Sequence, residues 1–458
     1  MKLRPFFDGS SRRSSRLNQA WFRHTLLTFG LATSALGLGH PPELAAQESA
    51  QRVAPRLEPQ VEPQPAGREF TDNESVDQFV FQPAPTTPRA APQPPERIED
   101  AARTARRTTR NEFVRYSKVP HMLGDSIGIP GQLIGSPGDT SQFEGRLPTT
   151  DLPLAAGRSF RVAENNRPLP ADRVYFTYHA FQNALSQSVL VPPSPPIVLS
   201  DSNVNLYTVG LEKTFGDGRN SVEVRVPMLG AIELDNGLGN TVRSGTLGDI
   251  TLFLKHLLYD DSQFALAAGV GIGLPTASDI TGQSFGSDFR IHTDAVHLMP
   301  YLGAMLRPTD DWFIQSFLQL DLATNGNPVT TAAGPGNPAD VLGKFTEQNL
   351  LIANLSVGRW LFQREEGVLQ GVAAITELHY TTSITDADNV GNVQNPFDTG
   401  FTIANAYNRV DVLNFTAGLH VQIGPLSNLR VACVTPLRSE AENRWFDSEI
   451  LVSFNRNF

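Results

Sequence analysis

Residues 263–274 read QFALAAGVGIGL, and this stretch decides the fold class because its residues change in character at every second position. One set of alternate positions holds bulky apolar residues such as Phe264, Leu266 and Ile272, while the other, from Ala265 to Gly273, holds only alanine and glycine. Successive side chains of a β-strand point to opposite faces. The stretch is therefore predicted to be a strand. Gly269–Gly273 resembles a nucleotide-binding loop, but no helix follows it, so we interpret its glycines as small inward residues.

The same period of two recurs along the last two thirds of the chain. Most of the runs are about 9–14 residues long, which exceeds the usual strand of a soluble sheet and matches a tilted strand that crosses a membrane. With 263–274 there are twelve runs: Arg173–Ala184, Asn203–Phe215, Ser221–Met228, Asp249–Tyr259, Gln263–Leu274, Ala295–Leu306, Trp312–Leu322, Asn349–Leu361, Leu369–Tyr380, Asp411–Ile423, Leu426–Pro436 and Trp445–Phe458.

The connections between these runs alternate strictly between short and long. The short ones are 216–220, 260–262, 307–311, 362–368 and 424–425, and the long ones are 185–202, 229–248, 275–294, 323–348, 381–410 and 437–444. An up-and-down transmembrane β-barrel gives this alternation, with tight periplasmic turns and longer outer loops, whereas a Greek-key sandwich does not. The predicted fold class is all-β: an up-and-down barrel of about twelve antiparallel strands, with both termini at the end that carries the tight turns.

Overall composition excludes several classes of protein. The 458 residues carry a formal net charge of −10, 40% are hydrophobic, and the mean hydropathy is −0.21. No apolar run reaches the roughly 18–20 residues that a spanning helix requires, so a helical membrane protein is excluded. The acidic balance argues against a nucleic-acid partner. A single cysteine, Cys433, excludes an intramolecular disulfide and a cysteine-built metal site.

The N-terminal part divides by composition into three segments that precede the barrel. Residues 1–46 have a basic start, an apolar core and small residues near Ala46, as a cleaved export signal does. Residues 47–110 are predicted to be a disordered proline-rich linker. Its basic end, 97–110, is either a solvated linker helix or an electrostatic tether to lipid or cell wall. Residues 111–170 are irregular, and are either periplasmic or a plug in the barrel. Residues 171–458 are predicted to form the barrel. This order predicts the bacterial outer membrane, with the N-terminal arm in the periplasm.

The segment Leu247–Asp279 resembles a family of outer-membrane barrels described as transporters of the phenol meta-cleavage pathway. The matching features are Gly248-Asp249 at the start of a strand, Lys255 within it, a tight acidic turn, and a small-residue strand that ends at Leu274-Pro275-Thr276. The next residue is Ala277, where the family usually has glycine. The resemblance extends over about 203–458. It implies an outer-membrane location and uptake of small solutes, hydrophobic or aromatic ones among them.

Aromatic residues near the ends of the runs suggest the two girdles of a membrane barrel: Phe215, Tyr259, Trp312 and Trp360 beside short turns, and Tyr380 and Trp445 beside long loops. The chain ends in an alternating strand with Phe458 as its last residue. This ending resembles the assembly signal of bacterial outer-membrane barrels. The resemblance implies the barrel-assembly machinery as a partner, in addition to outer-membrane lipid and a small-molecule solute.

No arrangement of residues for catalysis is evident. The chain has no Gly-x-Ser-x-Gly elbow, no His-Glu-x-x-His and no His-x-Ser-Asn-Gly, so no enzyme, no metal and no cofactor is predicted. The polar side chains predicted to face inward would instead line the lumen as a hydrated or salt-bridged wall. They are Glu223, Arg225, Lys255, His297, Gln319, Asp321, Arg359, Glu377, His379, His420, Arg430 and Glu449.

Three functions are compatible with this reading. The first is an outer-membrane channel or transporter for small solutes, with mixed charges along its path. The second is a structural barrel with a closed lumen, whose proline-rich arm anchors it to the cell wall. The third is a barrel enzyme that hydrolyses lipid. Twelve strands give a bore between that of a filled eight-stranded barrel and that of a sixteen-stranded porin, so a narrow or partly closed channel is expected.

Overall fold

The structure is a computed structural model, and it describes residues 119–125, 128, 131–137, 147–153, 161–191, 194–332, 339–386, 388–391, 399–405, 409–440 and 443–458. Contacts divide the chain into Met1–Ala90 and Ala91–Phe458, and every described residue belongs to the second unit. The predicted signal peptide and the predicted linker therefore lie outside the described residues. Among the described residues, no helix combines the length and the hydropathy needed to cross a membrane.

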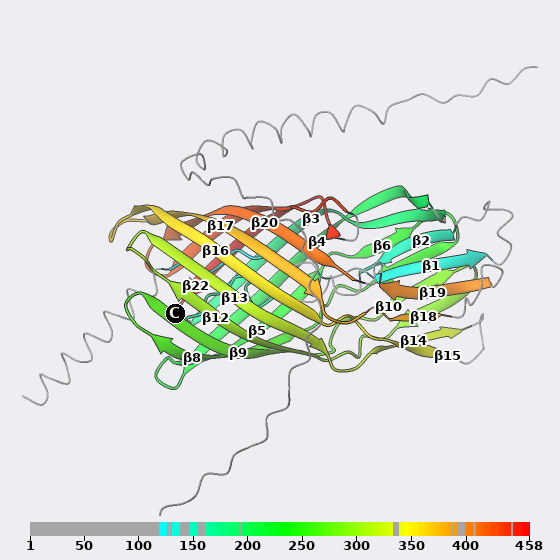
Figure 1. The fold of residues 1–458 in the computed structure, drawn as a ribbon, viewed down its shortest axis with the longest axis horizontal. Helices are drawn as coiled ribbons and strands as arrows, with labels where there is room; N and C mark the ends of the chain where they lie inside the picture. The colour runs from blue at the N-terminus through cyan, green and yellow to red at the C-terminus, as the bar shows by residue number, and fades with distance from the viewer. Residues whose placement is uncertain are drawn as a thin grey trace, which may run out of the picture. The chain divides into compact units, whose positions relative to one another are not determined.

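Twelve strands close into one antiparallel barrel (Figure 1). Each pairs with its neighbour along this set, and the last strand, β22, returns to the first, with Arg173 opposite Asn457 on one side and Glu212 on the other. The strands are β3 (Arg173–Val191), β4 (Ser194–Phe215), β5 (Asn220–Leu229), β8 (Thr251–Asp260), β9 (Phe264–Gly273), β12 (His297–Leu306), β13 (Trp312–Ala323), β16 (Leu350–Gln363), β17 (Leu369–Ser383), β20 (Asp411–Ile423), β21 (Ser427–Pro436) and β22 (Ser448–Asn457). The predicted fold class is confirmed.

The two faces of the barrel differ as the alternation predicts. Along β5, Ser221, Glu223 and Arg225 are buried, whereas the valines between them lie on the other face. Because the sheet is closed, its buried face is the inner one. The outer face carries a belt of exposed apolar side chains, which includes Leu211, Leu254, Leu302, Leu318, Leu355, Leu378, Val431 and Ile450.

Four of the six predicted girdle aromatics lie outside the buried interior. Phe215, Tyr259 and Trp312 are exposed beside short turns, and Tyr380 is half-buried on β17. The prediction was wrong for Trp360 and Trp445, which are 8% and 4% exposed and belong to the interior. Each has the parity of the inward residues of its run, Trp360 that of Ser356 and Trp445 that of Glu449, so its position near a strand end was a weaker signal than its parity.

Four of the six long connections, 229–248, 275–294, 323–348 and 381–410, contain two further short strands each, and residues 131–137 and 147–152, from the region predicted to be irregular, add one strand each. These strands form a layer that we call the cap, beyond the long-loop end of the barrel (Figure 1). The cap strands are β1 (Gly131–Pro137), β2 (Leu147–Leu152), β6 (Ile232–Asp235), β7 (Asn240–Ser244), β10 (Ile280–Ser284), β11 (Ser287–Ile291), β14 (Asn327–Ala332), β15 (Asp340–Phe345), β18 (Asn389–Gly391) and β19 (Thr399–Asn405).

The cap consists of two sheets that face each other. One sheet has the order β15-β14-β11-β10-β7-β6. The other consists of β18, β19, β1 and β2, of which β2 pairs with the C-terminal part of β3. The Phe289 and Phe401 rings, one from each sheet, lie 5.2 Å apart, and Leu133, Val242 and Val329 are fully buried around them. The cap therefore has an apolar core of its own.

Candidate functional site: the lumen of the barrel

Two segments of the chain lie against the inner wall of the barrel. The first inner segment is Val119–Asp125 and the second inner segment is Arg161–Ala171, and every residue of both is buried. They run antiparallel and bond to each other, because the Met122 N–H donates to the Asn166 carbonyl (2.7 Å) and the Asn165 N–H donates to the Leu123 carbonyl (3.4 Å). The segments come from the region for which the sequence left a periplasmic position and a plug both open.

The contacts also give the direction of each segment. Val119 lies beside Arg307 and Trp360 at the short-turn end, whereas Asp125 reaches the Asn414 amide near the start of β20. The second inner segment returns from Arg161, which pairs with Asp125, to Ala171 at the start of β3. The chain thus passes through the lumen toward the cap and comes back.

The wall holds the first inner segment through the backbone of that segment. The Arg430 guanidinium donates to the carbonyls of His121 (3.1 Å) and Met122 (2.8 Å). The Glu377 carboxylate accepts from the N–H groups of Leu123 (2.9 Å) and Gly124 (2.8 Å). The Gln315 amide donates to the Pro120 carbonyl (3.0 Å). These bonds satisfy backbone groups that would otherwise be buried without partners.

The second inner segment is held in the same manner by cations of the opposite wall. Arg225 donates to the carbonyls of Arg161 (2.9 Å) and Val162 (3.4 Å). Lys255 donates to the Arg167 carbonyl (2.9 Å), and Arg173 donates to the Asn165 carbonyl (2.6 Å). The Val162 N–H donates to Gln319 (2.8 Å).

The same cations are paired with carboxylates of the wall. Arg173 contacts Glu212 at 2.7 Å and Glu223 at 3.3 Å, Arg225 contacts Glu223 at 3.0 Å, and Lys255 contacts Glu212 at 3.0 Å. Removing one partner of a buried pair leaves an uncompensated charge, which is strongly destabilising. Each charge in this network therefore requires its partners to remain buried in the wall.

His179 connects the wall to the second inner segment. Its ring nitrogens lie 2.5 Å from a Glu449 carboxylate oxygen and 3.1 Å from a Glu164 carboxylate oxygen. On the facing wall, His379 lies 3.2 Å from Glu377 and 3.5 Å from Asp125. Both inner segments are thus tied to acid–histidine pairs.

Eleven of the twelve side chains predicted to line the lumen are buried on the inner face of their strands. Glu223, Arg225, Lys255, Gln319, Glu377, His379, Arg430 and Glu449 belong to the contacts described above. His297 pairs with Asp321 at 2.8 Å and lies 3.9 Å from Glu347. His420 packs against Trp360, with ring centroids 5.4 Å apart.

The prediction for Arg359 was wrong. Arg359 is exposed on the outer face of β16, and its guanidinium lies 5.3 Å from the centre of the Trp312 ring. It has the parity of Leu355, which also faces outward. A long cationic side chain at a strand end can cover apolar surface while its head group stays in water, so charge alone did not identify an inward residue.

The sequence reading missed several members of the network. Arg173, His179 and Glu212 alternate with apolar residues inside predicted runs, so the period of two could have identified them. Asp125, Arg161, Glu164 and Arg167 had no such signal, because they lie in segments without a period. Among the described residues, no group of three or more His, Cys, Asp or Glu is arranged to hold a metal ion.

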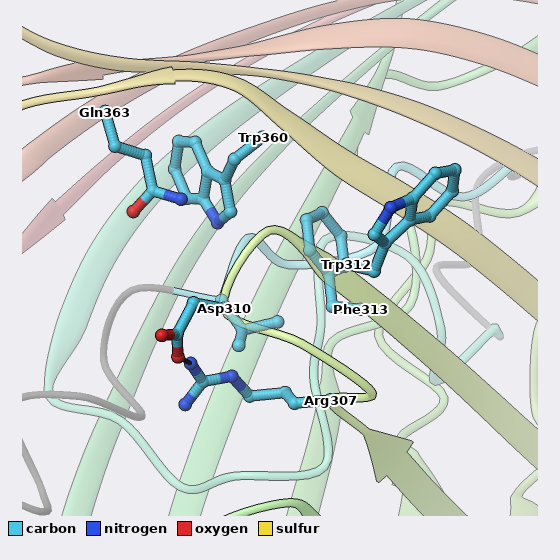
Figure 2. Close-up of a pocket in the computed structure, with 7 residues that line it drawn as sticks. Arg307, Asp310, Trp312, Phe313, Trp360 and Gln363 are labelled. Carbon is cyan, nitrogen blue, oxygen red and sulfur yellow. Dashed lines mark hydrogen bonds and ion pairs between the residues drawn. The ribbon is translucent and has the colours of Figure 1, made fainter.

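A cavity of about 260 Å³ opens beside the start of the first inner segment at the short-turn end (Figure 2). Figure 2 shows the indole of Trp360 and the amide of Gln363 on one side and the Arg307–Asp310 pair on the other. The Arg307 and Asp310 charges are 3.3 Å apart, and Asp310 is fully exposed. The cavity is lined by Val119, Arg307, Asp310, Trp312, Phe313, Trp360 and Gln363.

No family model and no curated protein matches this chain, so the family resemblance of Leu247–Asp279 stays a prediction. Solved structures resemble it in fold at low identity. The translocator domain of the autotransporter NalP from Neisseria meningitidis is 11% identical over 63% of this chain and 89% of that chain (TM-score 0.40). An outer membrane channel from Pseudomonas putida F1 is 12% identical over 64% and 97% (TM-score 0.38). The Pseudomonas putida toluene transporter TodX is 11% identical over 64% and 92% (TM-score 0.33).

Proposed function

We propose that this protein is an outer-membrane channel for small solutes and that its own two inner segments close it in the conformation described here. The observation that carries the proposal is the chemistry of the inner wall. Arg430, Glu377 and Gln315 bond to backbone groups of the first inner segment, and water can replace each of those bonds. A polar wall of this kind suits a path that opens, whereas a permanently filled barrel could be packed with apolar side chains.

The membrane location is part of the proposal and rests on the outer face. Its apolar belt is exposed, and Phe215, Tyr259 and Trp312 are exposed at the short-turn rim, as in the aromatic girdle of a transmembrane barrel. The short turns then lie in the periplasm and the cap lies outside the cell. Phe458 ends the chain beside Lys213 at the periplasmic rim, where the proposed assembly machinery would read it.

Planar-bilayer recording of the purified full chain tests this function. We expect rare, brief openings of the natural protein and long openings when residues 119–125 are replaced by a Gly-Ser segment of equal length. A Gly-Ser replacement of the exposed turn Arg364–Gly367 is the matched control and should leave the openings rare. Folded barrels that conduct in none of these forms, and that pass no solute in liposome-swelling assays, would exclude a channel.

The anchoring alternative is favoured by one observation: the lumen is occupied and the cap beyond it has an apolar core. A barrel that only fixes the envelope to the cell wall needs no path. Deletion of residues 47–110 separates the two proposals. Loss of envelope integrity with unchanged solute permeability supports an anchor, and intact envelopes support the channel.

A further inference from the structure

We propose that Gln315, Glu377 and Arg430 form a peptide-binding site on the inner wall, which we call the backbone clamp. In this structure the clamp holds the first inner segment, and we infer that it also accepts a separate extended peptide of the same kind. The inference deepens the proposed function, because occupancy of the clamp would decide whether the channel is closed.

The geometry of the clamp is that of backbone recognition. Arg430 binds two consecutive carbonyls, of His121 and Met122, and Glu377 binds the next two N–H groups, of Leu123 and Gly124. Hydrogen bonds to main-chain groups give affinity for any extended peptide, while pockets for the side chains give specificity. The clamp therefore recognises a stretch of polypeptide rather than a particular side chain.

Specificity comes from what surrounds the four bonded residues. Met122 and Leu123 are fully buried among apolar side chains. Gly124 has a φ of +88°, and a Cβ atom there would lie 2.6 Å from the Glu164 Cα atom, so no other residue fits without displacement. Asp125 pairs with Arg161. The ligand class is thus an extended peptide with two apolar residues, a glycine and an acidic residue in sequence.

The first inner segment is the part of the closure that can leave. The second inner segment continues into β3 at Arg173, and its Glu164 is held by His179. The first inner segment contributes no strand to the barrel at Val119–Asp125, so it can leave the clamp without breaking a strand pairing, while β1 and β2 keep the chain that follows it in the cap. Its Val119 end borders the 260 Å³ cavity at the short-turn mouth, which gives a competing peptide an entrance (Figure 2).

The test measures binding in trans. In the full-length protein, residues 119–125 are replaced by Gly-Ser, and a fluorescein-labelled peptide with the sequence of Val119–Asp125 (VPHMLGD) is titrated while its fluorescence anisotropy is followed. We expect saturable binding that weakens at least tenfold when Glu377→Gln or Arg430→Gln is added. Arg359→Gln is the matched control, because this arginine lies on the outer face, and it should leave the affinity unchanged.

A second route avoids dependence on one variant. Gly124→Val in the otherwise natural chain should expel the first inner segment and allow the same peptide to bind, whereas a peptide with valine in place of the glycine should not bind. Absence of saturable binding to both folded variants, or equal binding of the valine peptide, would overturn the clamp. The peptide should also block current through the opened barrel. Binding without current in any variant would retain the clamp and reject the channel.

Discussion

At the scale of single residues, the small inward side chains of β9 make room for their neighbours on the wall. A Cβ atom added at Gly269 would lie 2.2 Å from the Leu254 carbonyl and 2.3 Å from the Tyr301 ring, and one at Gly271 would lie 2.5 Å from the Phe253 ring. These glycines, interpreted from the sequence as small inward residues, let the large aromatic side chains of β8 and β12 lie across them. The wall is therefore packed where it has no charge.

This packing predicts that Gly269→Val destabilises the barrel, since overpacking costs about 1–3 kcal/mol in a well-filled interior. The midpoint of urea unfolding in lipid vesicles measures the effect. Ala268→Val is the matched control, because it places the same valine side chain at the neighbouring position on the outward face of β9. Equal midpoints for both variants would contradict the packing argument.

A second prediction concerns Asp151 in the cap, whose carboxylate accepts a hydrogen bond from the Ser186 N–H at 2.7 Å. Burial raises the pKa of Asp151 from 3.8 to about 6, so the folded cap binds a proton more tightly than the unfolded one. Ionisation of Asp151 lowers the free energy of unfolding of the cap. This loss is small below pH 4, grows between pH 4 and pH 6, and stays constant above pH 6. The cap should therefore be less stable at neutral than at acidic pH.

Hydrogen exchange of the β2 amides, corrected for intrinsic rates, measures this effect. We expect opening to be roughly tenfold more frequent at pH 7.5 than at pH 5, since one pKa unit corresponds to about 1.4 kcal/mol. Asp151→Asn should remove the difference, while Asp288→Asn, at an exposed position of β11, should retain it. A natural cap whose exchange is the same at both pH values would exclude this role.

At the scale of elements, the cap depends on its own apolar contacts. Phe289 on β11 is 3% exposed and packs against Phe401 on β19. Phe289→Ala should destabilise the cap by about 3 kcal/mol, the usual cost of truncating a buried phenylalanine, and leave the barrel folded. Limited proteolysis should then cleave the cap while the barrel keeps its heat-modifiable mobility in gels. Val341→Ala, at a position that is 70% exposed, should remain resistant.

The elements that the sequence predicts well are those with a long, uninterrupted period. β20 spans Asp411–Ile423, as predicted, because the eleven residues Leu413–Ile423 alternate without a break. The cap strands escaped prediction because most are short, such as β6 with four residues, and because glycines or prolines interrupt them. Between β10 and β11, Phe285 and Gly286 both have positive φ, as a tight hairpin requires, but only Gly286 is a residue type that indicates such a turn from the sequence.

Of the residues in the lumen, only those of the barrel wall could be predicted from the sequence. Parity within the runs placed Glu377 and Arg430 on the inner face, and the same parity, applied to Arg359, would have placed it outside. The sequence did not predict what these residues bind, because Val119–Asp125 and Arg161–Ala171 have no hydrophobic period. The wall binds their backbone N–H and carbonyl groups, which do not depend on residue type. Contacts between residues more than 250 positions apart, such as Leu123 with Glu377, depend on the closed barrel.

At the scale of the whole barrel, the path of the chain predicts which residues can be reached from each side of the membrane. The turn that holds Asp217 lies at the short-turn end, whereas Gly237, in the turn between β6 and β7, lies in the cap. In a Cys433→Ser background, Gly237→Cys should react with a membrane-impermeant maleimide on intact cells. Asp217→Cys should react only after the outer membrane is permeabilised. The reverse pattern would invert the proposed orientation.

The same labelling tests whether the chain crosses the lumen. β1 and β2 belong to the cap although they follow the first inner segment, whose Val119 lies at the opposite mouth. Gln132→Cys should therefore be protected from periplasmic reagents, and Arg307→Cys, beside Val119, should be open to them.

Because β2 pairs with β3 at Thr149 and Ser188, the cap would have to detach for the chain to withdraw. A crosslink between these two positions should trap residues 131–152 on the outer side while leaving the backbone clamp free to exchange its occupant. If the crosslink alone abolished exchange, the inner segments would move together with the cap.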